Sequence, residues 1–150
     1  MNTKHAVFQL NEEDYGLDIS EVNTVEKDVK LVKMENSPKN IKGKINLRGE
    51  DIPVLSLRRK FNFPDKEADN ETRYLITNIN GKNIALEVDQ VKGIQDIDQS
   101  DVYEVPQVVK SNNTSYLKSI AKIDGDLILL LDNSKLLDTE EVQVLEKIKK

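Results

Sequence analysis

The chain has 150 residues and a net charge of −5, with 37% hydrophobic and 33% charged residues. A chain of this length can bury enough surface for one domain or two small lobes. The acidic balance argues against nucleic acids and anionic membranes as partners, because both attract basic surfaces. The absence of cysteine excludes disulfides and thiolate metal sites. No apolar run approaches the roughly 20 residues that span a bilayer, so we expect a cytoplasmic protein.

Short strands joined by turns dominate the pattern, which is typical of an all-β protein. The expected strand pairs are 6–10 with 15–22, 45–47 with 52–55, 74–79 with 83–88, and 120–123 with 127–131. Asn80-Gly81 and Asp124-Gly125 are strong hairpin signals, and Gly49 can adopt the positive φ of a tight turn. The sequence therefore predicts four hairpins in chain order.

Three further segments complete the expected organisation. Residues 64–72 and 111–115 are polar and predict loops. The tail 139–150 predicts a helix, because Thr139 can cap it, acidic residues follow, and lysines end it. Its narrow apolar stripe favours a helix packed over the rest of the chain, with a partner-binding amphipathic helix as the alternative.

The chain contains a faint internal repeat. One set of positions recurs at an offset of 69 (86 − 17), namely Leu17, Ile19, Val22 and Val25 with Leu86, Val88, Val91 and Ile94. A second set recurs at an offset of 76 (125 − 49), namely Gly49, Ile52, Val54 and Ser56 with Gly125, Ile128, Leu130 and Asp132. The repeat predicts two similar β lobes, approximately 15–65 and 72–138, with the strand 6–10 as a candidate to join the second.

The residue types that catalysis requires are scarce. His5 is the single histidine, and we interpret it as a solvated residue near a mobile terminus. Without cysteine there is no Cys-His pair, and the glycines form no phosphate-binding loop. Carboxylates are plentiful, so a small β-barrel enzyme that uses paired carboxylates is the alternative. The basic cluster 58–60 is interpreted as one face of a short helix. We expect no enzymatic activity, no cofactor and no metal site.

The segment 41–57 carries a more specific signal. It reads Ile-Lys-Gly, then Asn-Leu-Arg-Gly, then Ile-Pro-Val, and it resembles the signature of the CheW family of bacterial chemotaxis adaptors. Segments 8–22, 84–91 and 124–137 resemble other parts of the same family, so the resemblance covers nearly the whole chain. One departure is Ser56, where the family usually has Asp. Both residues are good N-caps for the short helical segments expected at 57–61 and 133–137, so we expect fold and function to be preserved.

The resemblance implies a fold of two SH3-like five-stranded β-barrel lobes packed side by side, with short helices and a C-terminal helix, in one CheW-like domain over 1–150. It also implies a cytoplasmic scaffold, recruited to membrane-associated receptor arrays, that acts in two-component signal transduction. Such an adaptor couples the regulatory domain of the histidine kinase CheA to the cytoplasmic tips of methyl-accepting chemoreceptors. The alternative is a CheW-like module of another two-component pathway or of a receiver-fused adaptor.

The resemblance also implies a partner-binding site. Its positions are Val22, Gly43, Asn46, Leu47, Arg48 and Gly49. The glycines can permit turn geometry and close backbone approach to a partner, or serve folding alone. Val22 can supply apolar contact or ordinary core packing. Arg48 can pair with a partner carboxylate, or brace the hairpin from inside.

Overall fold

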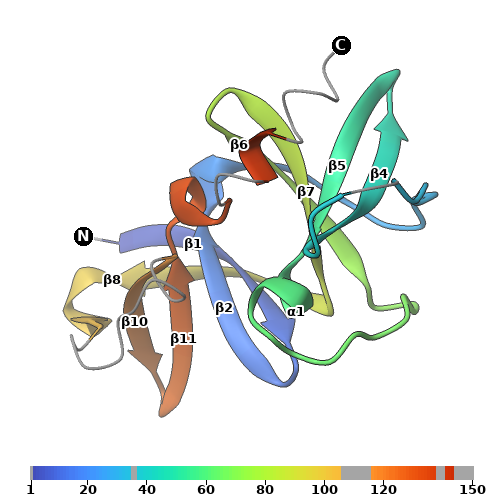
Figure 1. The fold of residues 1–150 in the computed structure, drawn as a ribbon. Helices are drawn as coiled ribbons and strands as arrows, with labels where there is room; N and C mark the ends of the chain where they lie inside the picture. The colour runs from blue at the N-terminus through green and yellow to red at the C-terminus, as the bar shows by residue number, and fades with distance from the viewer. Residues whose placement is uncertain (1, 35–36, 106–115, 138–140, 144–150) are drawn as a thin grey trace.

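The computed structural model describes residues 2–34, 37–105, 116–137 and 141–143, and the strands form two sheets (Figure 1). In spatial order the first sheet contains β3 (Val22–Glu26), β6 (Arg73–Ile79), β7 (Lys82–Val88), β5 (Glu50–Ser56) and β4 (Ile41–Leu47). The second contains β8 (Gln90–Asp98), β1 (Asn2–Leu10), β2 (Glu13–Asp18), β11 (Asp126–Leu131), β10 (Leu117–Ile123) and β9 (Val102–Glu104). We call the parts built on these sheets the first and second lobes. The expected all-β fold is confirmed, although the second sheet has six strands.

Short helices connect several of the strands. They are α1 (Leu57–Lys60) and the 3-10 turns η1 (Ile19–Glu21), η2 (Gln99–Asp101) and η5 (Asn133–Lys135). The Ser56 side chain accepts a hydrogen bond from the Arg59 N–H at 3.2 Å and caps α1. The Asp132 carboxylate accepts one from the Ser134 N–H at 3.1 Å and caps η5. The predicted equivalence of these caps is confirmed.

Four hairpins share one turn geometry. The dipeptides Asn11-Glu12, Arg48-Gly49, Asn80-Gly81 and Asp124-Gly125 each have positive φ at both positions, between 50° and 85°. Two-residue turns of this kind match the right-handed twist of the flanking strands. The predicted turns are therefore confirmed, and Arg48 belongs to the turn itself rather than to the end of β4.

The two sheets have the same internal register. Val54 in β5 pairs with Ala85 in β7, and Leu130 in β11 pairs with Gly16 in β2, both in parallel. These pairs differ by the offsets of the sequence repeat, 76 (130 − 54) and 69 (85 − 16). Bulges also recur, between Ile41 and Gly43 in β4 and between Leu117 and Ser119 in β10. The repeat therefore describes two copies of one strand arrangement.

The sheets do not follow the lobe boundaries expected at 15–65 and 72–138. β2 comes from the first half of the repeat but pairs with β11, and β7 comes from the second half but pairs with β5. Each half of the repeat thus contributes its first hairpin, β1–β2 or β6–β7, to the sheet of the other half. The loop 64–72 leads from the α1 region to β6 within the first lobe. The strand 6–10 lies within β1 of the second sheet.

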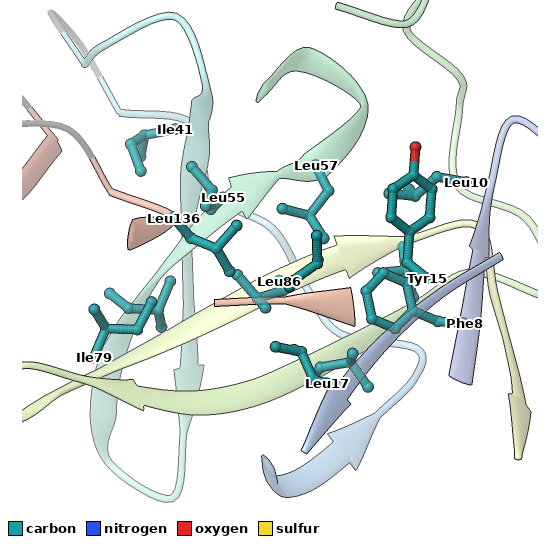
Figure 2. Packing of buried hydrophobic residues seen from close by; sticks show 14 residues of the cluster. Phe8, Leu10, Tyr15, Leu17, Ile41, Leu55, Leu57, Ile79, Leu86 and Leu136 are labelled. Atoms are coloured by element: carbon teal, nitrogen blue, oxygen red, sulfur yellow. The ribbon is translucent and has the colours of Figure 1, made fainter. Parts of the chain in front are cut away.

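A shared apolar core joins the lobes (Figure 2). Phe8, Tyr15 and Leu17 of the second sheet pack in one cluster with first-lobe residues such as Leu55 and Leu86. Each lobe also has a smaller cluster, around Ile52 in the first and around Ile128 in the second. Fully burying one such side chain contributes roughly 1.5–3 kcal/mol, so the central cluster ties the two lobes into one folding unit.

The end of the chain is described only in part. Most of the helix expected at 139–150, and the loop expected at 111–115, lie outside the described residues. Residues 141–143 are helical, and the buried Glu141 carboxylate pairs with the Lys60 ammonium of α1 at 2.9 Å. Within the described part of the chain, no helix is both long and apolar enough to cross a membrane.

Candidate partner-binding site

The candidate site begins at the tip of the β4–β5 hairpin. Arg48 and Gly49 form the turn, and Asn46 stabilises it because its Oδ1 accepts a hydrogen bond from the Gly49 N–H at 3.3 Å. Asn78 bonds the Gly81 N–H in the same way at 3.0 Å. Because the same arrangement recurs in a neighbouring hairpin, Asn46 has a clear role in turn formation.

A small charged cluster lies beside this turn. The Asp51 carboxylate accepts hydrogen bonds from Asn46 Nδ2 at 3.1 Å and from Lys44 Nζ at 3.2 Å. These donors hold the pKa of the Asp51 carboxyl below its usual range, with the amide of Asn46 as the largest cause. Asp51 is therefore a carboxylate at neutral pH, and its negative charge lies beside the turn that carries Arg48.

Arg48 is exposed, and its φ of 52° lies in the left-handed region. The region is unfavourable for side chains other than Asn, Asp and Gly, and it typically costs about 1–3 kcal/mol. Within the described residues, Arg48 makes no hydrogen bond or ion pair that would offset this cost. The geometry thus gives no support to bracing from inside the hairpin, and it leaves the guanidinium accessible.

Gly43 has a structural role in closing the first lobe. The segment after β3 crosses to the outer edge of β4, where Val32 and Lys44 exchange two backbone hydrogen bonds of 2.8 Å. A Cβ atom on Gly43 would collide with the carbonyl oxygen of Val32. Close backbone approach at this position is therefore intramolecular.

The other predicted positions differ in their solvent exposure. Val22 is partly buried and packs against the central cluster, while Leu47 is partly buried against the small cluster of the first lobe. Gly49 is exposed, with open space around it and a φ of 85°. Of the six predicted positions, Arg48 and Gly49 combine high exposure with a place at the turn, and Asn46 is the exposed residue that supports them.

Sequence reasoning missed the polar contacts that connect this hairpin to β3. The Asn83 amide nitrogen of β7 donates to both Glu50 carboxylate oxygens at 3.2 Å. The Asn83 oxygen accepts a hydrogen bond from Asn23 of β3, which follows Val22, at 3.5 Å. These contacts cross three strands that are distant in sequence, so no local pattern indicated them. They connect the β4–β5 hairpin to Asn23, whereas the side chain of the preceding Val22 packs against the central cluster.

The basic cluster 58–60 is committed to intramolecular ion pairs. Arg58 makes two hydrogen bonds of 2.7 Å to the Asp89 carboxylate, and Arg59 pairs with Asp65 at 3.0 Å. Asp89 lies between β7 and β8, and it also accepts the Asn11 N–H at 2.9 Å. The cluster therefore links α1 to the junction of the lobes. In the ranges that the structure covers, no three histidine or carboxylate groups come together as a metal site.

Comparison with known proteins decides the family. A family model described as the CheW-like domain matches residues 4–141. The chain belongs to the CheW family. It is similar to the chemotaxis protein CheW of Klebsiella aerogenes (28% identity over 144 residues, 96% of this chain and 87% of that protein). It is also similar to chemotaxis protein CheW of Bacillus subtilis (29% identity over 140 residues, 93% and 90%).

A solved CheW structure has the same fold. The scaffolding protein TtCheW from Thermoanaerobacter tengcongensis matches with a TM-score of 0.86 and 35% sequence identity, covering 94% of this chain and 96% of that one. The match includes both lobes of the CheW fold, and it is consistent with two SH3-like β lobes. The resemblance that rested on the Asn-Leu-Arg-Gly segment is therefore confirmed at the level of family and fold.

Proposed function

We propose that this protein is a non-enzymatic adaptor that couples the chemotaxis histidine kinase CheA to methyl-accepting chemoreceptors. The kinase would be held through its regulatory domain and the receptors through their cytoplasmic tips, so the adaptor would work at membrane-associated arrays. Membership in the CheW family and similarity to the scaffolding protein TtCheW support this role.

The exposed Arg48 in a left-handed turn is the observation that carries the proposal. A side chain that gains nothing from its own fold, at a position where Asn or Gly would be favoured, is explained by a contact outside the chain. Arginine is enriched at interfaces because its planar fork can bind a carboxylate with two hydrogen bonds. We assign Arg48 to a carboxylate of the receptor or the kinase, with Gly49 allowing close approach.

One carboxylate that lines a cavity of the second lobe has a structural role. Asp18 and Glu21 line one cavity of the second lobe. Asp18 Oδ1 already accepts hydrogen bonds from the Ser20 N–H and Oγ, at 2.9 and 2.8 Å, and caps η1. This oxygen is therefore held by the cap and is not available to take a proton from substrate, whereas Asp18 Oδ2 and the Glu21 carboxylate make no hydrogen bond within the described chain.

The proposal is tested by reconstitution of the three-part complex. Purified CheA, membranes containing a receptor of the same organism, and this chain are combined, and CheA autophosphorylation is measured. We expect kinase activity to depend on this chain and to change when the receptor binds attractant. The Arg48→Glu variant should lose this control while its circular dichroism spectrum stays that of the wild type.

Two results would contradict the proposal. A folded wild-type chain that binds neither the kinase regulatory domain nor receptor tips would exclude the coupling role, and it would favour a different two-component scaffold. Full receptor control of the kinase by Arg48→Glu would retain the adaptor role but remove Arg48 from the site.

A further inference from the structure

The internal repeat provides an unusual comparison between the two lobes. In the first lobe, the Tyr74 hydroxyl donates to Glu87 Oε2 at 3.0 Å, and Lys42 Nζ donates to Glu87 Oε1 at 2.9 Å. Tyr74 and Glu87 are directly paired in β6 and β7 and are only 4% and 9% exposed. The phenol ring thus covers a carboxylate–lysine pair, and we call these three residues the Tyr74 cluster.

The same three positions exist in the second lobe. By the offsets 69 (74 − 5 and 87 − 18) and 76 (118 − 42), the counterparts are His5, Asp18 and Lys118. His5 and Asp18 are directly paired in β1 and β2, as Tyr74 and Glu87 are in the first lobe. The carboxylate and the lysine are therefore kept, while the tyrosine is replaced by a smaller ring.

The second lobe has a cavity at this position. The cavity has a volume of about 330 Å³, and its wall includes His5, Asp18 and Lys118. This volume lies at the lower end of the range for small-ligand pockets, about 300–1,000 Å³. Ile97, Leu130 and Leu131 form an apolar part of the cavity wall. His5 is partly buried within β1, paired on both sides, rather than near a mobile terminus as expected.

The polar groups of the cavity are less engaged than their first-lobe counterparts. Within the described chain, Lys118 makes no ion pair with Asp18 or any other carboxylate, and His5 contacts only the Thr3 carbonyl oxygen, at 3.3 Å. Glu21 also lines the cavity, and burial together with the charge of Asp18 raises its pKa. Carboxylates and a lysine thus face a space that none of the described side chains fills.

We propose that this cavity is a docking pocket for a tyrosine side chain of a protein partner. The phenol would lie in the cavity beside the His5 ring, with its hydroxyl donating to a carboxylate of the cavity and its ring against the apolar wall. Tyrosine suits such a site because a buried phenol hydroxyl requires a hydrogen-bond partner, and tyrosine anchors are frequent in interfaces. The inference rests on the repeat and the cavity, and it does not depend on the proposed function.

The test uses the full chain, labelled with ¹⁵N, and amino-acid amides as probes. N-acetyl-tyrosine amide is titrated while amide chemical shifts are followed, with the phenylalanine and arginine analogues as comparators. We expect saturable shifts for tyrosine, with a millimolar dissociation constant, confined to amides around His5, Asp18 and Lys118. The phenylalanine analogue should bind at least about tenfold more weakly, because it lacks the hydroxyl donor.

Two variants locate the site. His5→Tyr restores the first-lobe residue and should fill the pocket from within, which removes the shifts and raises the melting temperature. Lys4→Tyr places the same ring on the other face of β1, at an exposed position, and should leave binding unchanged. The proposal is overturned by absent shifts in the wild type, by equal binding of phenylalanine, by stronger binding of arginine, or by unchanged binding in His5→Tyr. Because the wild-type shifts are read without any variant, misfolding of His5→Tyr would not remove the test.

Discussion

The carbonyl oxygen of Val32 occupies the space that a side chain at Gly43 would need. This contact closes the first lobe, because Val32 and Lys44 exchange their backbone hydrogen bonds beside it. The second lobe is closed in a similar way, by β9 on β10, but Ser119, the counterpart of Gly43 at the offset of 76 (119 − 43), carries a side chain.

Replacing Gly43 with alanine should therefore destabilise the protein. The Val32 segment has to move away from β4, and forced overpacking of this kind costs about 1–3 kcal/mol. Urea unfolding followed by circular dichroism measures the loss. The matched substitution Ser119→Ala should change the free energy of unfolding by less than about 0.5 kcal/mol. Equal losses in the two variants would show that closure of the first lobe does not need glycine.

Replacing Arg48 with asparagine should stabilise the fold and weaken partner binding. Asparagine tolerates the left-handed φ of 52° that Arg48 adopts, so the gain should be about 1 kcal/mol. The reverse change Asn80→Arg, at the same turn position of the neighbouring hairpin, should cost a similar amount. Thermal unfolding of both variants checks the pair, and a destabilised Arg48→Asn would mean that the arginine side chain supports the hairpin.

Replacing Ser56 with alanine should remove the cap of α1. The Arg59 N–H loses the Ser56 hydroxyl as its acceptor, and loss of an N-cap typically costs about 1 kcal/mol. Ser56→Asp, which introduces the usual family residue, should retain wild-type stability. Chemical unfolding of the two variants distinguishes the effect of losing the capping hydrogen bond from the effect of changing the side-chain size. A destabilised Ser56→Asp would contradict the equivalence of serine and aspartate as caps.

The Arg58–Asp89 pair should contribute to stability at neutral pH and less in acid. Burial alone would raise the pKa of the Asp89 carboxyl, but hydrogen bonds from Arg58 and from the Asn11 N–H outweigh burial and lower it. A lowered folded-state pKa gives stability that is present above the unfolded value, about 3.9, and is lost as pH falls through the folded value.

Asp89→Asn should therefore lower the free energy of unfolding at pH 7 by roughly 3 kcal/mol. The loss of stability that the wild type shows on acidification, from about pH 5 to about pH 2, should be smaller in this variant. Unfolding free energies over this pH range provide the measurement. The control Asp65→Asn removes the same charge from an exposed pair with Arg59 and should cost less than about 1 kcal/mol. A pH profile of Asp89→Asn that parallels the wild type would exclude Asp89 as a source of acid sensitivity.

Much of the local structure could be predicted from sequence because it depends on neighbouring residues. Asn80-Gly81 and Asp124-Gly125 specify their turns through backbone conformation, and Ser56 and Asp132 specify their caps through one side-chain oxygen. The offsets of 69 and 76 also proved to be real structural registers, since they relate equivalent strand pairs.

The exchange of strands between halves could not be predicted in this way. β2 pairs with β11, and β7 with β5, across long stretches of chain and in parallel, and local patterns carry no information on which distant edge a strand will join. Parts of the candidate partner-binding site also depend on long-range pairing and could not be predicted from local patterns. The resemblance indicated Gly43, but only the crossing of Val32 explains why it is glycine, and the contact of Asn83 with Glu50 depends on the same long-range pairing.

The central claim is that Arg48 presents a binding group at the tip of the first lobe, and receptor-tip binding tests it most directly. Isothermal titration of a receptor-tip fragment into wild type, Arg48→Glu and Lys122→Glu compares the same charge change at hairpin ends of the two lobes. We predict saturable binding by wild type and by Lys122→Glu, with binding lost in a folded Arg48→Glu. Wild-type affinity of Arg48→Glu for the receptor tip, and also for the CheA regulatory domain in a parallel titration, would contradict the account.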